Sequence, residues 1–134
     1  MPGNFFDTNV LLYVVSGDPA KAEKSAALLA DGGTISVQVL NEIVNVARRK
    51  LHRSWSEIHG FLTYVRAFLL VLPVTIATHE AGLEIAEHYG LSTYDSMIAA
   101  AALQAECDTL WSEDMHHGLL IADRLRVVNP FGAT

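Results

Sequence analysis

Four acidic side chains are far apart in the chain, but each falls at or near a junction between expected elements of secondary structure: Asp7, Glu42, Asp95 and Asp114. Two follow short apolar segments typical of buried strands, and two lie near the start of helical segments. In a parallel α/β sheet, ligands collect outside the carboxyl ends of the strands. Four carboxylates gathered there would repel one another, and a hard divalent cation would relieve the repulsion. The pattern predicts a site for Mg²⁺ or Mn²⁺, since zinc would favour Cys or His ligands.

Three of these acids also have a purely structural interpretation. Asp7 lies between a strand and a short helix, where Asp is a common N-cap. Asp95 is the fourth residue of a capping-box pattern that begins at Ser92. Glu42 lies opposite the apolar stripe of its helix, which favours a solvated position, although valines flank it one turn away on either side. The metal hypothesis therefore rests on the acids taken jointly.

The fourth acid has a rival beside it. Asp114 follows Glu113 after an expected strand, and the alternation of side chains does not choose between them. His116 and His117 come next and could bind a transition metal, but adjacent side chains point in different directions and loop histidines are usually solvated. We expect the histidines to lie outside the site.

Strands and helices alternate along the chain, which predicts a mainly parallel sheet with helices on both faces. We expect strands at residues 3–6, 34–37, 70–74, 109–112 and 125–128. We expect helices at residues 8–15, 20–30, 39–52, 54–68, 78–88 and 92–106. No linker or repeat interrupts the pattern, so residues 1–134 form one three-layer α/β/α domain with five strands.

Bulk composition favours a compact cytoplasmic protein. Apolar residues make up 51% of the 134 positions, and the net charge is −6 from 9 basic and 15 acidic residues. This acidic balance argues against a protein that coats nucleic acid electrostatically, but less against a nuclease whose acids hold metal. Cys107 is the single cysteine, so no internal disulfide can form. No signal peptide is evident, and no apolar run reaches the roughly 18 residues of a membrane span.

The basic residues cluster at one helix end: Arg48, Arg49, Lys50 and Arg53. Cations are favourable at a helix C-terminus, which explains the cluster without any ligand. Within it, Arg49 lies two turns after Glu42 on the same face. It is the best candidate for a contact with a substrate phosphate or with a protein partner.

Three segments resemble the PIN-domain ribonucleases, and among them the VapC-type toxins of toxin–antitoxin pairs: residues 6–13, 91–101 and 110–115. The resemblance extends over essentially the whole chain and includes the position of Glu42 in the helix after the second strand. It identifies Asp7, Glu42 and Asp95 as the acidic triad and Asp114 as the fourth acid. Thr8 and Ser112 correspond to the hydroxyl neighbours of the site.

The resemblance also implies a strand order and an activity. The order would be 3-2-1-4-5, with the strand before Asp7 in the centre. The activity would be hydrolysis of single-stranded RNA, dependent on Mg²⁺ or Mn²⁺, that leaves 5′-phosphate and 3′-hydroxyl ends. The partners would be a second copy of the chain in a homodimer and a cognate antitoxin that blocks the groove.

Other folds also cluster acids on a parallel sheet. A phosphate-accepting receiver domain, which transfers phosphate with Mg²⁺, would need adjacent acids after strand one and a lysine after a late strand. Here Asp7 stands alone, and residues 125–130 contain no lysine. A haloacid-dehalogenase-type phosphatase would need a second Asp at the position of Asn9. A catalytically silent interaction module remains the alternative from another class, although the presence of all four acids argues against it.

Overall fold

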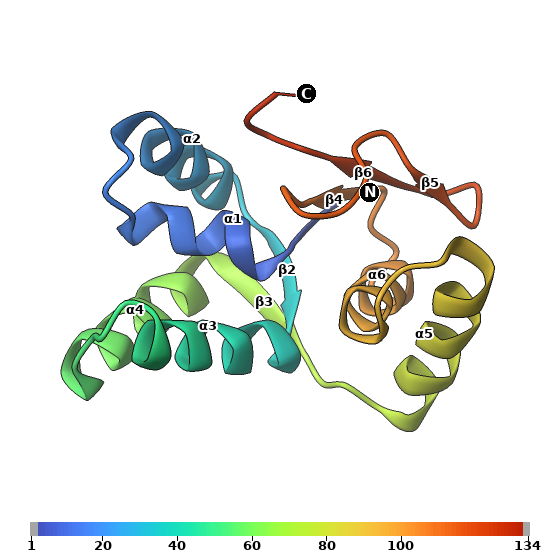
Figure 1. The fold of residues 1–134 in the computed structure, drawn as a ribbon, viewed down its shortest axis with the longest axis horizontal. Helices are drawn as coiled ribbons and strands as arrows, with labels where there is room; N and C mark the ends of the chain where they lie inside the picture. Colours follow the sequence, from blue (N-terminus) through green and yellow to red (C-terminus); the bar gives the residue numbers. More distant parts are fainter. Residues whose placement is uncertain (1–2, 133–134) are drawn as a thin grey trace.

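The structure, a computed structural model, describes residues 3–132 and contains one sheet between two layers of helices (Figure 1). The strands are β1 (Asn4–Phe6), β2 (Gly33–Ser36), β3 (Leu69–Leu72), β4 (Thr109–Trp111), β5 (Leu120–Ile121) and β6 (Leu125–Val128). The helices are α1 (Thr8–Leu12), the 3₁₀ helix η1 (Tyr13–Val15), α2 (Pro19–Ala30), α3 (Val37–Arg49), α4 (Trp55–Phe68), α5 (Ile76–Tyr89) and α6 (Thr93–Gln104).

The sheet has the order β3-β2-β1-β4-β6-β5, which places β1 in its interior. The first five strands of that series pair in parallel, so the expected parallel order is confirmed. The sixth strand, β5, was not expected and pairs antiparallel with β6. Two residues are too few to give a periodic signal, and the turn after β5 uses Ala122 and Asp123 at positive φ instead of glycine.

Helices α1 to α4 lie on one side of the sheet, and α5 and α6 pack against each other on the other side (Figure 1). The expected helices are confirmed with small shifts at their ends. The first divides into α1 and η1, and α3 begins directly after β2 and ends at Arg49. Strand β3 is an edge strand, as Pro73 predicts, and it stops at Leu72 because Pro73 has no N–H for a further ladder bond.

The core surrounds the end of β1. Phe5 and Phe6 are fully buried, and α6 is buried along residues 96–102. A strand buried on both faces holds its last residue firmly, so the position of Asp7 is set by the centre of the domain. Within residues 3–132 there is no helix with the length and apolar character needed to span a bilayer.

Candidate metal centre

Asp7 leaves the carboxyl end of β1 and caps α1 at the same time. Its Oδ1 accepts the N–H of Thr8 at 2.8 Å, while its Oδ2 accepts the Ser112 hydroxyl at 2.7 Å and the Asn9 amide at 3.3 Å. Asp7 is only 4% exposed, and Ser112 is fully buried. The capping interpretation is correct, and it does not exclude a metal, because each carboxylate oxygen has more than one lone pair.

The surroundings of Asp7 disfavour its charge. Burial, together with repulsion from Asp95 and Glu42, raises the pKa of Asp7 to about 6, although the hydrogen bonds from Ser112 and Thr8 act in the opposite direction. An ionised carboxylate in this position at neutral pH is unstable relative to one in water. A nearby cation would reverse that balance.

Glu42 projects from α3 and is half-buried. Its Oε1 accepts the Thr8 hydroxyl at 2.6 Å, and its Oε2 accepts the Gln38 amide at 3.0 Å. The same Gln38 amide donates to the backbone carbonyl of Tyr94 at 3.1 Å, next to Asp95. Gln38 therefore ties the start of α3 to the start of α6 and brings two of the acids to the same place.

Asp95 lies in the first turn of α6, where its N–H donates to the Ser92 hydroxyl at 3.2 Å. Ser92 is the expected N-cap, but among the described residues the Asp95 carboxylate does not accept the Ser92 N–H in return, so only half of the expected capping box forms. Burial raises the pKa of Asp95, and repulsion from Asp114 and Glu42 adds to the effect while the Ser92 hydroxyl opposes it. The mutual repulsion of these carboxylates shows that they share one electrostatic environment.

All four predicted acids line one open hollow of about 310 Å³. Its lining is Asp7, Thr8, Asn9, Leu12, Glu42, Asn45, Val46, Lys50, Asp95 and Asp114. Three polar members were not predicted: Asn9, Asn45 and Lys50. Asn45 could have been found as the residue one helical turn after Glu42, and Asn9 as a polar residue two positions after Asp7. Arg49 does not belong to the lining, whereas its neighbour Lys50 does.

The two acids after β4 lie in different places. Asp114 lines it, whereas Glu113 binds the Tyr13 hydroxyl and the Lys21 ammonium, each at 2.6 Å. His116 and His117 are exposed and outside the lining, and His117 Nδ1 accepts the N–H of Asn129 at 2.9 Å.

The carboxylates around the hollow suit a hard cation that keeps part of its water shell. They do not form a closed site that surrounds a metal on all sides. Within residues 3–132, no three His, Cys, Asp or Glu side chains come together in a ready-made metal site. The acids instead surround an open space, and like charges without a counterion are expected to stay apart. Mg²⁺ tolerates such an arrangement, since it keeps several waters and takes only one or two carboxylates directly.

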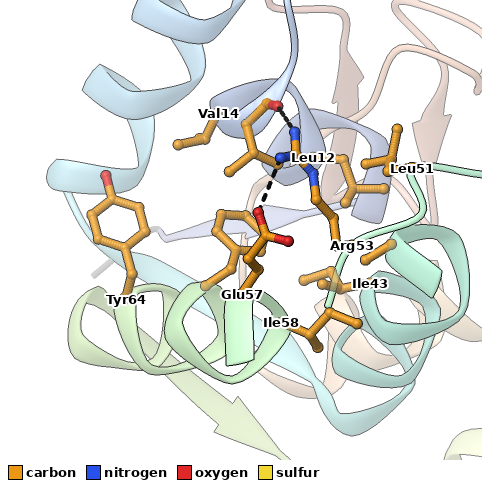
Figure 2. A pocket seen from close by; sticks show the side chains of 11 residues that line it. Leu12, Val14, Ile43, Leu51, Arg53, Glu57, Ile58 and Tyr64 are labelled. Atoms are coloured by element: carbon orange, nitrogen blue, oxygen red, sulfur yellow. Dashed lines mark hydrogen bonds and ion pairs between the residues drawn. The ribbon is translucent and has the colours of Figure 1, made fainter. Parts of the chain in front are cut away.

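A second hollow of the molecule is a largely apolar groove (Figure 2). It measures about 370 Å³ and lies between η1, α3 and α4; its lining is Leu12, Val14, Val15, Ile43, Ala47, Leu51, Arg53, Glu57, Ile58, Phe61 and Tyr64. Arg53 crosses one end, where it pairs with Glu57 at 3.3 Å and donates to the Val15 carbonyl at 3.3 Å. Leu12 lines both the groove and the acidic hollow.

Comparison with known proteins gives consistent results. The PIN domain family model matches residues 5–122. A toxin–antitoxin complex from Klebsiella pneumoniae has a chain of similar structure, with a TM-score of 0.72 and 19% identity over 95% of this chain and 97% of that one. FitAcB from Neisseria gonorrhoeae has a TM-score of 0.70 and 20% identity, over 97% of this chain and 99% of that one. VapC20 of Mycobacterium tuberculosis, a toxin that cleaves the sarcin-ricin loop, has a TM-score of 0.62 and 18% identity, over 83% of this chain and 89% of that one. No curated protein sequence matches significantly. At these identities the structural likeness establishes a shared fold.

Proposed function

Because the chain belongs to the PIN domain family, we propose that it is a metal-dependent endoribonuclease that hydrolyses single-stranded RNA. The observation that carries the proposal is the acidic hollow, where four carboxylates from four separate parts of the chain line one space. The raised pKa of Asp7, about 6, indicates a site whose charge is unbalanced without a cation.

Asp7, Glu42, Asp95 and Asp114 would hold Mg²⁺ or Mn²⁺. A divalent cation bound there would supply positive charge that stabilises a phosphodiester transition state and makes water more acidic. Ser112 and Asn9 hold the Asp7 carboxylate in place, and Thr8 and Gln38 orient Glu42. These contacts fix the carboxylates before substrate arrives, as electrostatic catalysis requires. The expected products carry 5′-phosphate and 3′-hydroxyl ends.

Lys50 is the proposed contact for the RNA backbone. It is the cation in the lining of the hollow, and it forms no ion pair with any other residue in the part of the chain that the structure describes. A lysine at the rim can bind a phosphate and position the strand without reading its sequence. Arg49 is exposed beside it and remains a proposed contact for RNA or for a protein partner.

We infer a toxin role, with a cognate antitoxin, because one of the similar structures is a toxin–antitoxin complex and another is a toxin. The apolar groove of Figure 2 shares Leu12 with the acidic hollow, so a protein segment bound there would reach the entrance of the site. A homodimer and a cytoplasmic location complete the proposal. Leu70 on β3 and Ile76 at the start of α5 are 62% and 75% exposed and are the proposed apolar contacts with a second copy.

Cleavage assays test the activity directly. Purified protein is incubated with single-stranded RNA and Mg²⁺ or Mn²⁺, then with EDTA, and the series is repeated with Asp7→Ala. We expect cleavage that EDTA and the substitution both abolish, and products that become substrates for 5′-labelling only after phosphatase treatment. Cleavage indifferent to both EDTA and Asp7→Ala would reject the proposal. Growth arrest on expression, relieved by Asp95→Asn, would support the toxin role.

A further inference from the structure

Three side chains from η1, α2 and the loop after β4 meet: Tyr13, Lys21 and Glu113. The Lys21 ammonium donates to Glu113 Oε2 at 2.6 Å, and the Tyr13 hydroxyl donates to Glu113 Oε1 at 2.6 Å. Lys21 also lies 3.3 Å from the Tyr13 hydroxyl oxygen. Both carboxylate oxygens of Glu113 are therefore engaged, by η1 on one side and α2 on the other. We call this group the Tyr13–Lys21–Glu113 clamp.

Aromatic rings shield the clamp on one side. The Lys21 ammonium lies 4.5 Å from the centre of the Tyr13 ring and 5.1 Å from that of Phe131. The two rings meet edge to face at 4.9 Å. An isolated exposed ion pair contributes little to stability, but this pair combines shared hydrogen bonds with two cation–π contacts. The clamp is therefore a better-ordered contact than an ordinary surface salt bridge.

Backbone contacts tie the same loop to the site. The N–H of Glu113 donates to Asn9 Oδ1 at 3.2 Å, and the N–H of Met115 donates to the Ser112 hydroxyl at 3.2 Å. Asn9 and Ser112 both donate to Asp7 Oδ2. The residues on both sides of Asp114 are thus fixed to the groups that hold Asp7.

Asp114 itself is exposed and is repelled by Asp95 across the hollow. Repulsion favours any movement of the loop that takes Asp114 away from the other acids. We propose that the Tyr13–Lys21–Glu113 clamp positions Asp114 against this repulsion and so sets the affinity of the site for a divalent cation. The inference rests on the proposed metal centre. Glu113 acts through Asp114, because Lys21 and Tyr13 keep its own carboxylate away from the hollow.

A purely stabilising clamp would make a different prediction. Its loss would lower the melting temperature of the metal-free protein but leave metal affinity unchanged. A positioning clamp must change metal affinity by more than any equally destabilising substitution elsewhere. The two roles are separated by comparing variants with matched losses of stability.

The test measures Mn²⁺ binding by calorimetry, without RNA, on the full chain. Glu113→Gln and Lys21→Met break the ion pair, and Lys21→Arg keeps the positive charge. Lys24→Met removes an exposed cation one turn along α2, and Thr75→Ala removes the N-cap of α5, where Thr75 accepts the N–H of Thr78 at 3.2 Å. Groups that orient metal ligands typically contribute 10- to 100-fold in affinity, so we expect Glu113→Gln and Lys21→Met to weaken Mn²⁺ binding about 10-fold. Lys21→Arg should retain most of the affinity, and both controls should bind as the wild type does.

The outcomes separate this inference from the proposed activity. Wild-type affinity in both Glu113→Gln and Lys21→Met would overturn the clamp, and so would an equal loss in Thr75→Ala. A wild type that binds no Mn²⁺ would overturn the metal centre and the clamp together. If the wild type binds Mn²⁺ but cuts no RNA, the ribonuclease proposal fails while the calorimetry still decides the role of the clamp.

Discussion

Asp7→Asn removes the charge that the fold disfavours most, and the consequence for stability can be worked out. The pKa of Asp7 is raised from 3.8 to about 6, first by burial and then by repulsion from Asp95 and Glu42. The native protein therefore holds this proton more tightly than the unfolded chain does. Between pH 3.8 and about 6, the native state binds more protons than the unfolded state, so the Asp7 contribution to stability decreases as pH rises.

The size of the effect follows from the shift. The rise in the pKa of Asp7 from 3.8 to about 6 corresponds to about 3 kcal/mol of destabilisation of the folded protein once the pH exceeds 6. Asparagine carries no charge at any of these pH values. However, both oxygens of Asp7 accept hydrogen bonds, and the NH₂ group that replaces one of them in asparagine cannot. One such hydrogen bond contributes about 1 kcal/mol. Asp7→Asn should therefore be more stable than the wild type by about 2 kcal/mol at pH 7 and less stable by about 1 kcal/mol at pH 4.

Urea denaturation in EDTA at several pH values between 4 and 7.5 measures this difference. The decisive quantity is the change in the difference between variant and wild type across the pH range, because a lost hydrogen bond lowers stability equally at every pH. Parallel stability curves for the two proteins would refute the argument that Asp7 is ionised at a cost in the metal-free fold. Adding Mg²⁺ should stabilise the wild type and leave the variant nearly unchanged.

Three further predictions concern the same site. Lys50→Ala should weaken RNA binding and reduce the slope of log affinity against log salt by about 0.7, measured by fluorescence anisotropy with Ca²⁺ in place of Mg²⁺, because one phosphate contact is lost. Lys24→Ala, which removes an exposed cation outside the lining of the hollow, is the matched control, and equal slopes for wild type and Lys50→Ala would refute the contact. Ser112→Ala removes a hydrogen bond that lowers the pKa of Asp7, so this pKa should rise above about 6. The acid limb of kcat/KM against pH should then move to higher pH, since metal binding requires the ionised carboxylate, and an unmoved limb would contradict this. Asp114→Asn should raise the melting temperature in EDTA but reduce the gain from Mg²⁺, because it relieves the repulsion of Asp95; a gain from Mg²⁺ equal to that of the wild type would show that Asp114 does not bind the ion.

The parallel part of the fold followed from the sequence because its elements carry strong local signals. The strand before Asp7 is aromatic and ends on a polar turn, and α6 lacks charge along residues 96–104. Strand β5 was not expected, because two residues are too few for a periodic pattern. The turn that joins it to β6 also lacks the usual glycine signal, since Ala122 and Asp123 take the positive φ values there. A strand of that length depends on its neighbour and has no pattern of its own.

The gathering of the four acids around one hollow could be predicted from the sequence, but the other side chains of its lining could not. Helical periodicity favoured Arg49 as the basic residue on the same face as Glu42. However, α3 ends at Arg49, and Lys50 is its C-cap, where helical periodicity no longer gives the direction of the side chain. Lys50, not Arg49, lines the hollow. The choice between Glu113 and Asp114 depended on Tyr13 and Lys21, which lie about a hundred positions earlier in the chain. Such long-range partners leave no trace in the local spacing.

The proposed metal centre can be observed by locating manganese through anomalous scattering, in crystals of the wild-type protein grown with MnCl₂. We expect an anomalous peak within the acidic hollow, with oxygen atoms of Asp7 and of at least one other of the four acids at coordination distance, about 2.0–2.6 Å for a hard cation. A hollow without a peak at saturating manganese, or a peak held only by residues outside it, would show that these four acids do not form a metal site.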